Sequence, residues 1–113
     1  MVIGSWIKEL PVAITVCDVN GVILEMNEKS CAVFAKDGGR DLIGKNLLDC
    51  HPGAARAKLE EMLRTQSANT YSIELNGKKQ FIYHSPWYEN GGFRGFVELI
   101  MDVPVEAPHF VRK

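Results

Sequence analysis

The spacing of hydrophobic residues changes from helical to strand-like near the start of the chain. Residues 2–10 carry apolar side chains at positions i, i+3, i+4 and i+7, which predicts an amphipathic helix that ends before Pro11. The runs 12–18 and 22–26 are rich in β-branched residues and flank Asn20-Gly21, a pair typical of a tight hairpin turn. The sequence therefore predicts a short helix followed by a β-hairpin.

The middle of the chain returns to helical spacing. Asn27 is a good N-cap for a helix over 28–35, and a helical turn is predicted at 41–45. Residues 46–53 show no regular pattern. The stretch 54–66 has apolar side chains on one face and charged side chains mostly on the other, which predicts a longer amphipathic helix.

The last third of the chain has the alternation of β-strands. Strands are predicted at 70–75, 78–87 and 93–103, joined by tight turns. The whole order predicts an α+β fold, with a five-stranded antiparallel sheet and helices packed on one face. We divide it into an N-terminal amphipathic helix (1–10), a domain (11–103) and a loosely ordered C-terminal tail (104–113).

Composition narrows the class of protein. The chain has 113 residues, of which 46% are hydrophobic and 24% charged, with a formal net charge of -1, as in a single globular domain. The absence of a basic excess argues against direct nucleic-acid binding. There is no apolar run long enough to span a membrane and no secretory signal. Three widely spaced cysteines fit reduced thiols, so we expect a cytoplasmic protein.

Several segments together resemble a PAS domain. Leu10-Pro11 followed by 14–27 is similar to the first hairpin of that family, which ends at an asparagine that starts the next helix. The segment 42–45 resembles the stretch before the family's long helix, and 93–103 resembles its closing strand. The resemblance implies a sensory or interaction module, not an enzyme. Such domains bind a small molecule between sheet and helices, or dimerise, and act on an effector domain or partner.

A more local resemblance lies at Asp49-Cys50-His51-Pro52, which is similar to the Cys-His-Pro signature of a bacterial subgroup of PAS domains. Gly53 departs from the second proline usual there, and Pro104 departs from the usual threonine after the last strand. The second departure puts in question the continuous helix that commonly leads into an effector domain.

His51 is the sharpest candidate for cofactor chemistry. The family's known cofactors include haem, flavin and small organic acids, and haem-binding relatives carry their axial histidine on or near the long helix. A neutral imidazole is a good iron ligand, and Met62 with nearby leucines would line a porphyrin pocket. The alternative is that His51-Pro52 only starts a helix, with the imidazole bonded to backbone. Cys50 is either a redox thiol or metal ligand, or a buried structural thiol, which we favour because no CxxC motif and no base other than His51 is near it.

Aromatic residues concentrate in the strand 78–87. Alternation places Tyr83 and Trp87 on one face and His84 on the other, and both faces contain apolar residues. We expect Tyr83 and Trp87 to contribute to a ligand cavity, although the sequence leaves open which face points inward. An aromatic core without a ligand is the alternative.

The predicted N-terminal helix is a candidate dimer contact. Its apolar stripe either packs on a second subunit, giving the homodimer we favour, or folds back on its own sheet. The stripe consists of Ile3, Trp6, Ile7 and Leu10. The chain has no nucleophile elbow, phosphate loop or HExxH motif, so an enzyme is not predicted.

Three functions remain open at this stage. The first is a regulatory PAS domain in signal transduction, including regulation of transcription, with a small ligand, dimerisation or both. The second is a haem-based gas or redox sensor with His51 as the axial ligand. The third is a pure protein-interaction module.

Overall fold

A computed structural model describes residues 4–113. Five antiparallel strands form one sheet in the order β2-β1-β5-β4-β3, which confirms the predicted α+β class. The strands are β1 (Ala13–Asp18), β2 (Ile23–Met26), β3 (Asn69–Leu75), β4 (Lys78–Glu89) and β5 (Gly92–Val103). The helices are α1 (Ser5–Lys8), α2 (Glu28–Val33) and α3 (Ala54–Thr65), and the 3-10 helices are η1 (Ala35–Asp37), η2 (Gly39–Leu42) and η3 (Leu47–Cys50).

The turn between β1 and β2 forms where the Asn-Gly pair predicts it. Gly21 has a φ of 85°, a conformation that glycine adopts at little cost. The Asp18 carboxylate accepts hydrogen bonds from the backbone N–H groups of Asn20 and Val22 at 2.9 and 3.0 Å. The turn is therefore held by its own side chain as well as by the hairpin.

Asn27 joins three elements with one buried side chain. Its Oδ1 accepts hydrogen bonds from the backbone of Ser30, which confirms the predicted N-cap, and also from the backbone of Ile14 in β1. Its Nδ2 donates to the carbonyls of Ile7 and Val12. Only 2% of Asn27 is exposed, so these four bonds are made away from water, where an unmade bond is costly.

Two helical predictions need correction. The first helix is shorter than predicted, because α1 covers only Ser5–Lys8 and the chain leaves helical geometry before Pro11. The segment predicted as irregular contains η3, whose first turn is capped by the Asn46 side chain accepting from Leu48 N at 2.9 Å.

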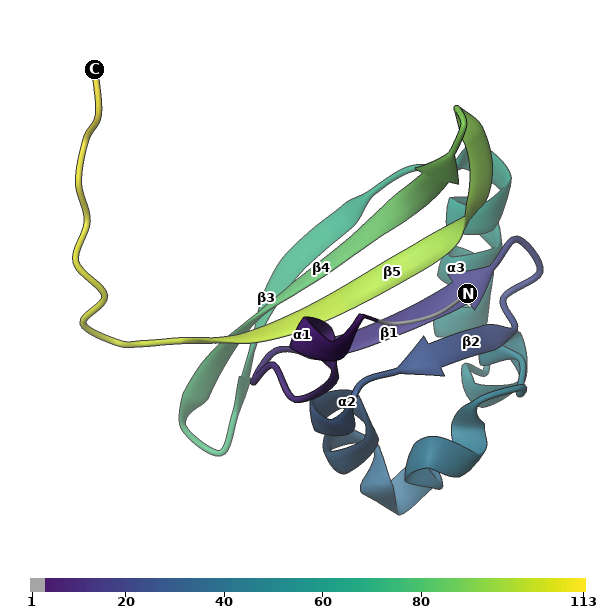
Figure 1. Cartoon of the computed structure of the whole chain (residues 1–113), viewed down its shortest axis with the longest axis horizontal. Coiled ribbons are helices and arrows are strands. Elements are labelled where there is room, and N and C mark those ends of the chain that lie inside the picture. Colours follow the sequence, from purple (N-terminus) through teal and green to yellow (C-terminus); the bar gives the residue numbers. More distant parts are fainter. Residues whose placement is uncertain (1–3) are drawn as a thin grey trace.

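The sheet lies between two unequal helical layers (Figure 1). In that view α3 is behind the sheet and the short α1 is in front of it. We call the α3 side the inner face and the α1 side the outer face. Residues after β5 form no regular secondary structure and run away from the body of the molecule (Figure 1). None of the helices within residues 4–113 is long and apolar enough to cross a membrane.

The strand pairing decides which side chains belong to the inner face. Facing residues of an antiparallel pair share a side of the sheet. Ile82 pairs with Ile100, which pairs with Ala13, and these three form one buried cluster on the inner face. Phe81 and Tyr83 therefore belong to the outer face.

Candidate functional site

A cavity of about 520 Å³ lies between the inner face and the helical segment from α2 to α3. Most of its wall is apolar and is contributed by both layers. The apolar lining includes Ile23, Met26, Phe34, Leu47, Met62 and Phe96. The cavity is therefore large enough and apolar enough to hold a small organic molecule.

One row of polar residues crosses the sheet inside this cavity. Strand pairing sets Thr15 opposite Glu98, Glu98 opposite His84, and His84 opposite Asn69. All four side chains line the cavity and come from four different strands. We call Thr15, Glu98, His84 and Asn69 the polar row. The rows on either side of it are apolar, with Ile82 opposite Ile100 on one side and Pro86 opposite Phe96 on the other.

The centre of the polar row is a short contact between two ionisable side chains. His84 Nε2 lies 2.7 Å from Glu98 Oε2, and the two side chains are 19% and 26% exposed. His84 Nδ1 is buried without a hydrogen-bond partner among the described residues. The Tyr71 ring packs against the imidazole, with ring centroids 5.8 Å apart. The imidazole is thus fixed by Glu98 on one side and by an aromatic ring on another.

Burial and nearby carboxylates raise the pKa values of two side chains in the cavity wall, Cys17 and Tyr71. Burial, opposed in part by a backbone hydrogen bond from Phe96, raises the pKa of the Cys17 thiol, and the carboxylates of Asp18 and then Glu98 add to that rise. Burial and then Glu98 raise the pKa of the Tyr71 hydroxyl. Both groups line the cavity, which favours their neutral forms.

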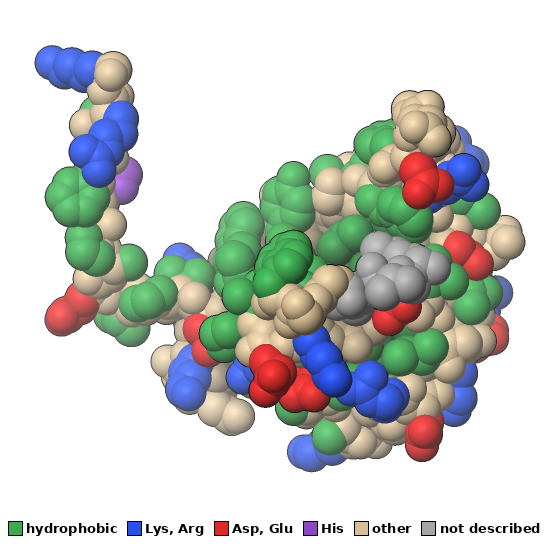
Figure 2. Space-filling model, in the orientation of Figure 1, with side chains coloured by type: hydrophobic (Ala, Val, Ile, Leu, Met, Phe, Trp, Pro, Cys, Tyr) green, Lys and Arg blue, Asp and Glu red, His purple; other side chains and the backbone are tan. Residues whose placement is uncertain are grey.

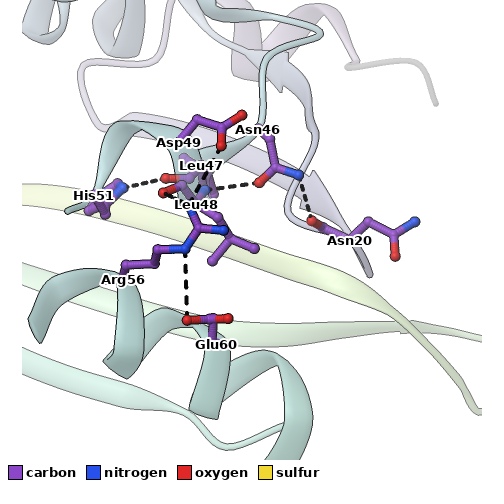
Figure 3. A network of polar contacts seen from close by, with 8 residues as sticks. All are labelled: Asn20, Asn46, Leu47, Leu48, Asp49, His51, Arg56 and Glu60. Atoms are coloured by element: carbon purple, nitrogen blue, oxygen red, sulfur yellow. Dashed lines mark hydrogen bonds and ion pairs between the residues drawn. The ribbon is translucent and has the colours of Figure 1, made fainter. Parts of the chain in front are cut away.

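The edge of the cavity near α3 is built around His51 (Figure 3). His51 Nδ1 lies 2.7 Å from the Leu47 carbonyl oxygen, which fixes the ring orientation. Arg56 donates to the Leu48 carbonyl at 3.1 Å and lies 3.6 Å from Asp49 and 3.8 Å from Glu60. The imidazole is thus bonded to backbone, as one sequence hypothesis expected, while the residue also lines the cavity.

The structure brings together some of the predicted site residues and separates others. Cys50, His51 and Met62 all line the cavity, but Cys50 is exposed, so its predicted burial is wrong. Tyr83 and Trp87 do not, and their predicted place in the cavity is wrong. Tyr83 pairs with Leu99 on the outer face, while the Trp87 indole donates to the Cys17 carbonyl at 3.1 Å. The alternation of β4 correctly predicts that Tyr83 and Trp87 share a face. The opposite face of β4, which carries His84, is the one that α3 covers.

Glu98 is the site residue that the sequence did not reveal. It lies in a nearly continuous apolar run, where a single carboxylate gives no sign of facing inward. Within residues 4–113, no three His, Cys, Asp or Glu side chains come close enough to form a metal site.

The predicted dimer contacts fall into different environments. Trp6 is 73% exposed. Ile7 and Leu10 are half-buried, and Ile3 lies outside the described residues. Figure 2 shows hydrophobic side chains gathered on this α1 side of the molecule. The dimer itself stays a prediction.

The sequence over residues 7–104 matches the family model described as PAS fold, so the chain belongs to the PAS fold family. Its fold is shared with solved domains of low sequence identity. A C-terminal domain from Streptococcus mutans is 19% identical, with a TM-score of 0.70 and 90% of each chain covered. A sensory box sensor histidine kinase from Vibrio cholerae is 21% identical, with a TM-score of 0.61 and 88% of each chain covered.

A third structure with this fold is the Aer2 receptor from Vibrio cholerae, described as a dual PAS-heme oxygen sensor. It is 15% identical, with a TM-score of 0.60, and the match covers 82% of this chain and 95% of that one. No curated protein matches the sequence significantly.

Proposed function

We propose that this PAS domain is a sensory module of signal transduction that binds a small organic ligand between its sheet and α3. The observation that carries the proposal is the apolar cavity of about 520 Å³ with a polar row across its floor. A filled core would bury apolar groups throughout, whereas this cavity offers apolar surface and hydrogen-bonding groups at one place.

Binding would act on the packing of the helical segment. The cavity wall joins β1 and β5 to η3 and α3, so a ligand touches both layers at once. A ligand shifts an equilibrium only by its differential affinity for the two states. We infer that it stabilises one position of η3 and α3 relative to the sheet, and that an effector domain or partner, including a transcription regulator, responds to that position.

Native mass spectrometry of the protein purified without denaturation tests ligand binding. We expect an adduct of small-molecule mass, and expect Ala55→Trp to remove it, because Ala55 lines the cavity from α3. The control is Ala57→Trp, the same substitution at an exposed position of the same helix that does not line the cavity. Equal adduct in both variants, or no adduct in the unaltered protein, would count against a ligand in this cavity.

A haem sensor is the second candidate, and one contact favours it. The Leu47 carbonyl fixes His51 through Nδ1, which leaves Nε2 as the nitrogen available to a metal. His51 therefore fits as one axial ligand, with Met62 and Met26 also on the cavity wall. Haem would supply an iron that binds gases or changes oxidation state.

Absorption spectra before and after addition of hemin test this candidate. We expect a Soret band that His51→Ala removes or shifts and that His109→Ala, a change in the exposed tail, leaves in place. A spectrum that is only the sum of hemin and protein rejects haem binding. It leaves the cavity to another ligand.

Dimerisation is a further part of the proposed function. Trp6 is 73% exposed on the outer side, where Phe81 and Tyr83 are also more than one-third exposed. Exposed aromatic residues of this kind are common at protein interfaces. We expect Trp6→Glu to weaken a homodimer in light scattering, with Val105→Glu in the tail as the control. A monomeric mass for the unaltered protein would reject the dimer.

A further inference from the structure

We propose that the cavity takes a small, mainly apolar ligand that carries a cationic or N–H-bearing nitrogen group, and that this group binds the free oxygen of the Glu98 carboxylate. The proposal rests on the proposed function, because it requires that the cavity binds a ligand. It adds the chemical class of that ligand.

The first step is the position of Glu98. The residue lies in β5, which is flanked by β1 and β4, and its side chain lines the cavity. Oε2 accepts from His84, whereas Oε1 has no hydrogen-bond or ion-pair partner among the described residues. Oε1 is not among the buried unpartnered atoms, so it is open to a donor from a ligand in the cavity, and a carboxylate forms stronger hydrogen bonds than a neutral acceptor.

The second step is how His84 contacts the carboxylate. His84 Nε2 lies 2.7 Å from Glu98 Oε2, while His84 Nδ1 is buried without a hydrogen-bond partner among the described residues. The imidazole therefore engages one oxygen of the carboxylate and leaves the other oxygen open to the cavity.

The third step is the effect of the Glu98 carboxylate on its neighbours in the cavity. Burial and then Glu98 raise the pKa of Tyr71, and for Cys17 Glu98 adds to a rise caused first by burial and then by Asp18. These two side chains and Glu98 line the same cavity. The field there opposes an added anion and favours an added cation or hydrogen-bond donor.

The fourth step is the shape of the remaining wall. Phe96, Met62 and Leu59 give an apolar surface beside the polar row. A ligand with one nitrogen group and an apolar body matches this division. The groups that would instead attract an anion, Lys58 and His51, lie on the helical side of the cavity, and Lys58 is exposed.

Three probes of similar shape separate these possibilities: benzamidine, which is a cation with N–H donors, benzoate, which is an anion, and neutral benzyl alcohol. Each is titrated into ¹⁵N-labelled protein and followed by the backbone amide signals of Thr15, His84 and Glu98. We expect benzamidine to bind about ten-fold more tightly than benzoate, as a charge-assisted hydrogen bond would give.

The key variant is Glu98→Gln, which preserves shape and an acceptor for His84 but removes the charge. We expect it to weaken benzamidine about ten-fold and to leave benzyl alcohol nearly unchanged. The control is Glu74→Gln, an exposed carboxylate in β3 that does not line the cavity. The dispersion of the amide spectrum confirms that each variant is folded.

Each remaining outcome overturns the proposal in a recognisable way. If benzoate binds as tightly as benzamidine, or if Glu98→Gln has no effect on benzamidine binding, the carboxylate does not select the ligand. If benzyl alcohol alone binds, the cavity still takes ligands and only the nitrogen class is wrong. If none of the three probes shifts the cavity signals, ligand binding in the cavity is overturned together with this proposal.

Discussion

The two faces of the sheet differ in which side chains they cover. The inner face has polar side chains under the helical segment, and the outer face has aromatic side chains that are partly exposed. The inner face lies against the helical segment, yet the polar row of Thr15, Glu98, His84 and Asn69 crosses it. The outer face carries Phe81 and Tyr83, which are 37% and 38% exposed. A sheet with one solvated side usually has apolar residues inside and polar residues outside. The inner face therefore offers hydrogen-bonding groups inside an apolar cavity, and the outer face offers exposed aromatic surface.

The two faces also gain stability in different ways. On the outer face, Ile14 and Val16 are almost fully buried, so they contribute by removing apolar surface from water. On the inner face, the His84–Glu98 contact must first repay the desolvation of both groups. The His84–Glu98 contact therefore adds polar groups to the cavity wall, and we expect little or no net gain in stability from it.

We expect the largest loss of stability from a substitution at Gly95, where β5 approaches the backbone of β1 so closely that a side chain would disrupt the sheet itself. Gly95→Ala would place a Cβ 1.9 Å from the Cys17 carbonyl oxygen, at a φ of 144° that alanine does not tolerate. Neither strand can move aside without losing the pairing of β1 with β5. We expect a loss of more than about 4 kcal/mol in the free energy of unfolding, measured with urea.

Gly92→Ala is the matched control in the same strand, because its Cβ would meet only an ordinary contact of 3.5 Å. A similar loss in both variants would show that glycine flexibility in β5, and not the approach to Cys17, sets the effect.

We expect the next largest loss of stability from a substitution at Asn27, which bonds to elements on both sides of the sheet. Asn27→Ala removes the bonds that join Ile7 before the sheet, Ile14 within it and Ser30 at the start of α2. We expect a loss of about 2–4 kcal/mol in urea unfolding, because buried backbone groups lose their partners. Asn46→Ala, a partly exposed cap, is expected to lose about 1 kcal/mol. Equal losses would contradict a special role for Asn27.

A smaller effect tests the inner face alone. Glu98→Leu leaves His84 Nε2 without its acceptor, and we expect a loss of about 1–3 kcal/mol. The double change His84→Leu with Glu98→Leu removes both partners, and we expect stability equal to or above that of the unaltered protein.

The exposed pair Gln80 and Asp102, bonded at 3.0 Å across the same two strands, is the control. Changing both of its members to leucine should alter stability by less than about 0.5 kcal/mol. A double His84 and Glu98 variant that is less stable than Glu98→Leu alone would show that the pair stabilises the fold.

The smallest expected effect is a dependence of stability on alkaline pH. The pKa values of Cys17 and Tyr71 are raised in the folded protein above their ordinary 9.0 and 10.0. Above pH 9 the unfolded chain therefore loses protons that the folded chain retains, and stability falls as pH rises. Well below pH 9 both states are protonated at Cys17, and its contribution is constant.

Urea unfolding at several pH values from 7 to 10 measures this slope. We expect Cys17→Ala to flatten it, and Cys50→Ala, an exposed thiol, to leave it unchanged. A steeper fall in Cys17→Ala than in the unaltered protein would contradict the assignment.

The local structure of this protein follows from short-range patterns in its sequence. The Asn20-Gly21 turn, the capping by Asn27 and the amphipathic pattern of α3 all depend on residues within a few positions of one another. These local signals, in their order along the chain, were also enough to indicate the PAS fold. They placed Cys50, His51 and Met62 near one cavity because the helical segment that carries them has a single face toward the sheet.

Which face of β4 points inward, and what His84 contacts there, depends on pairing between strands that are distant in the sequence. Both faces of β4 carry apolar residues, so alternation alone does not tell which one α3 covers. If the pairing of Tyr88 with Phe93 next to the turn continued along the strands without interruption, His84 would lie opposite Val97. A bulge between Trp87 and Tyr88 shifts the register by one residue, and Glu98 becomes the partner. The shift inserts an extra residue beside Gly95, and pairing between distant strands fixes it.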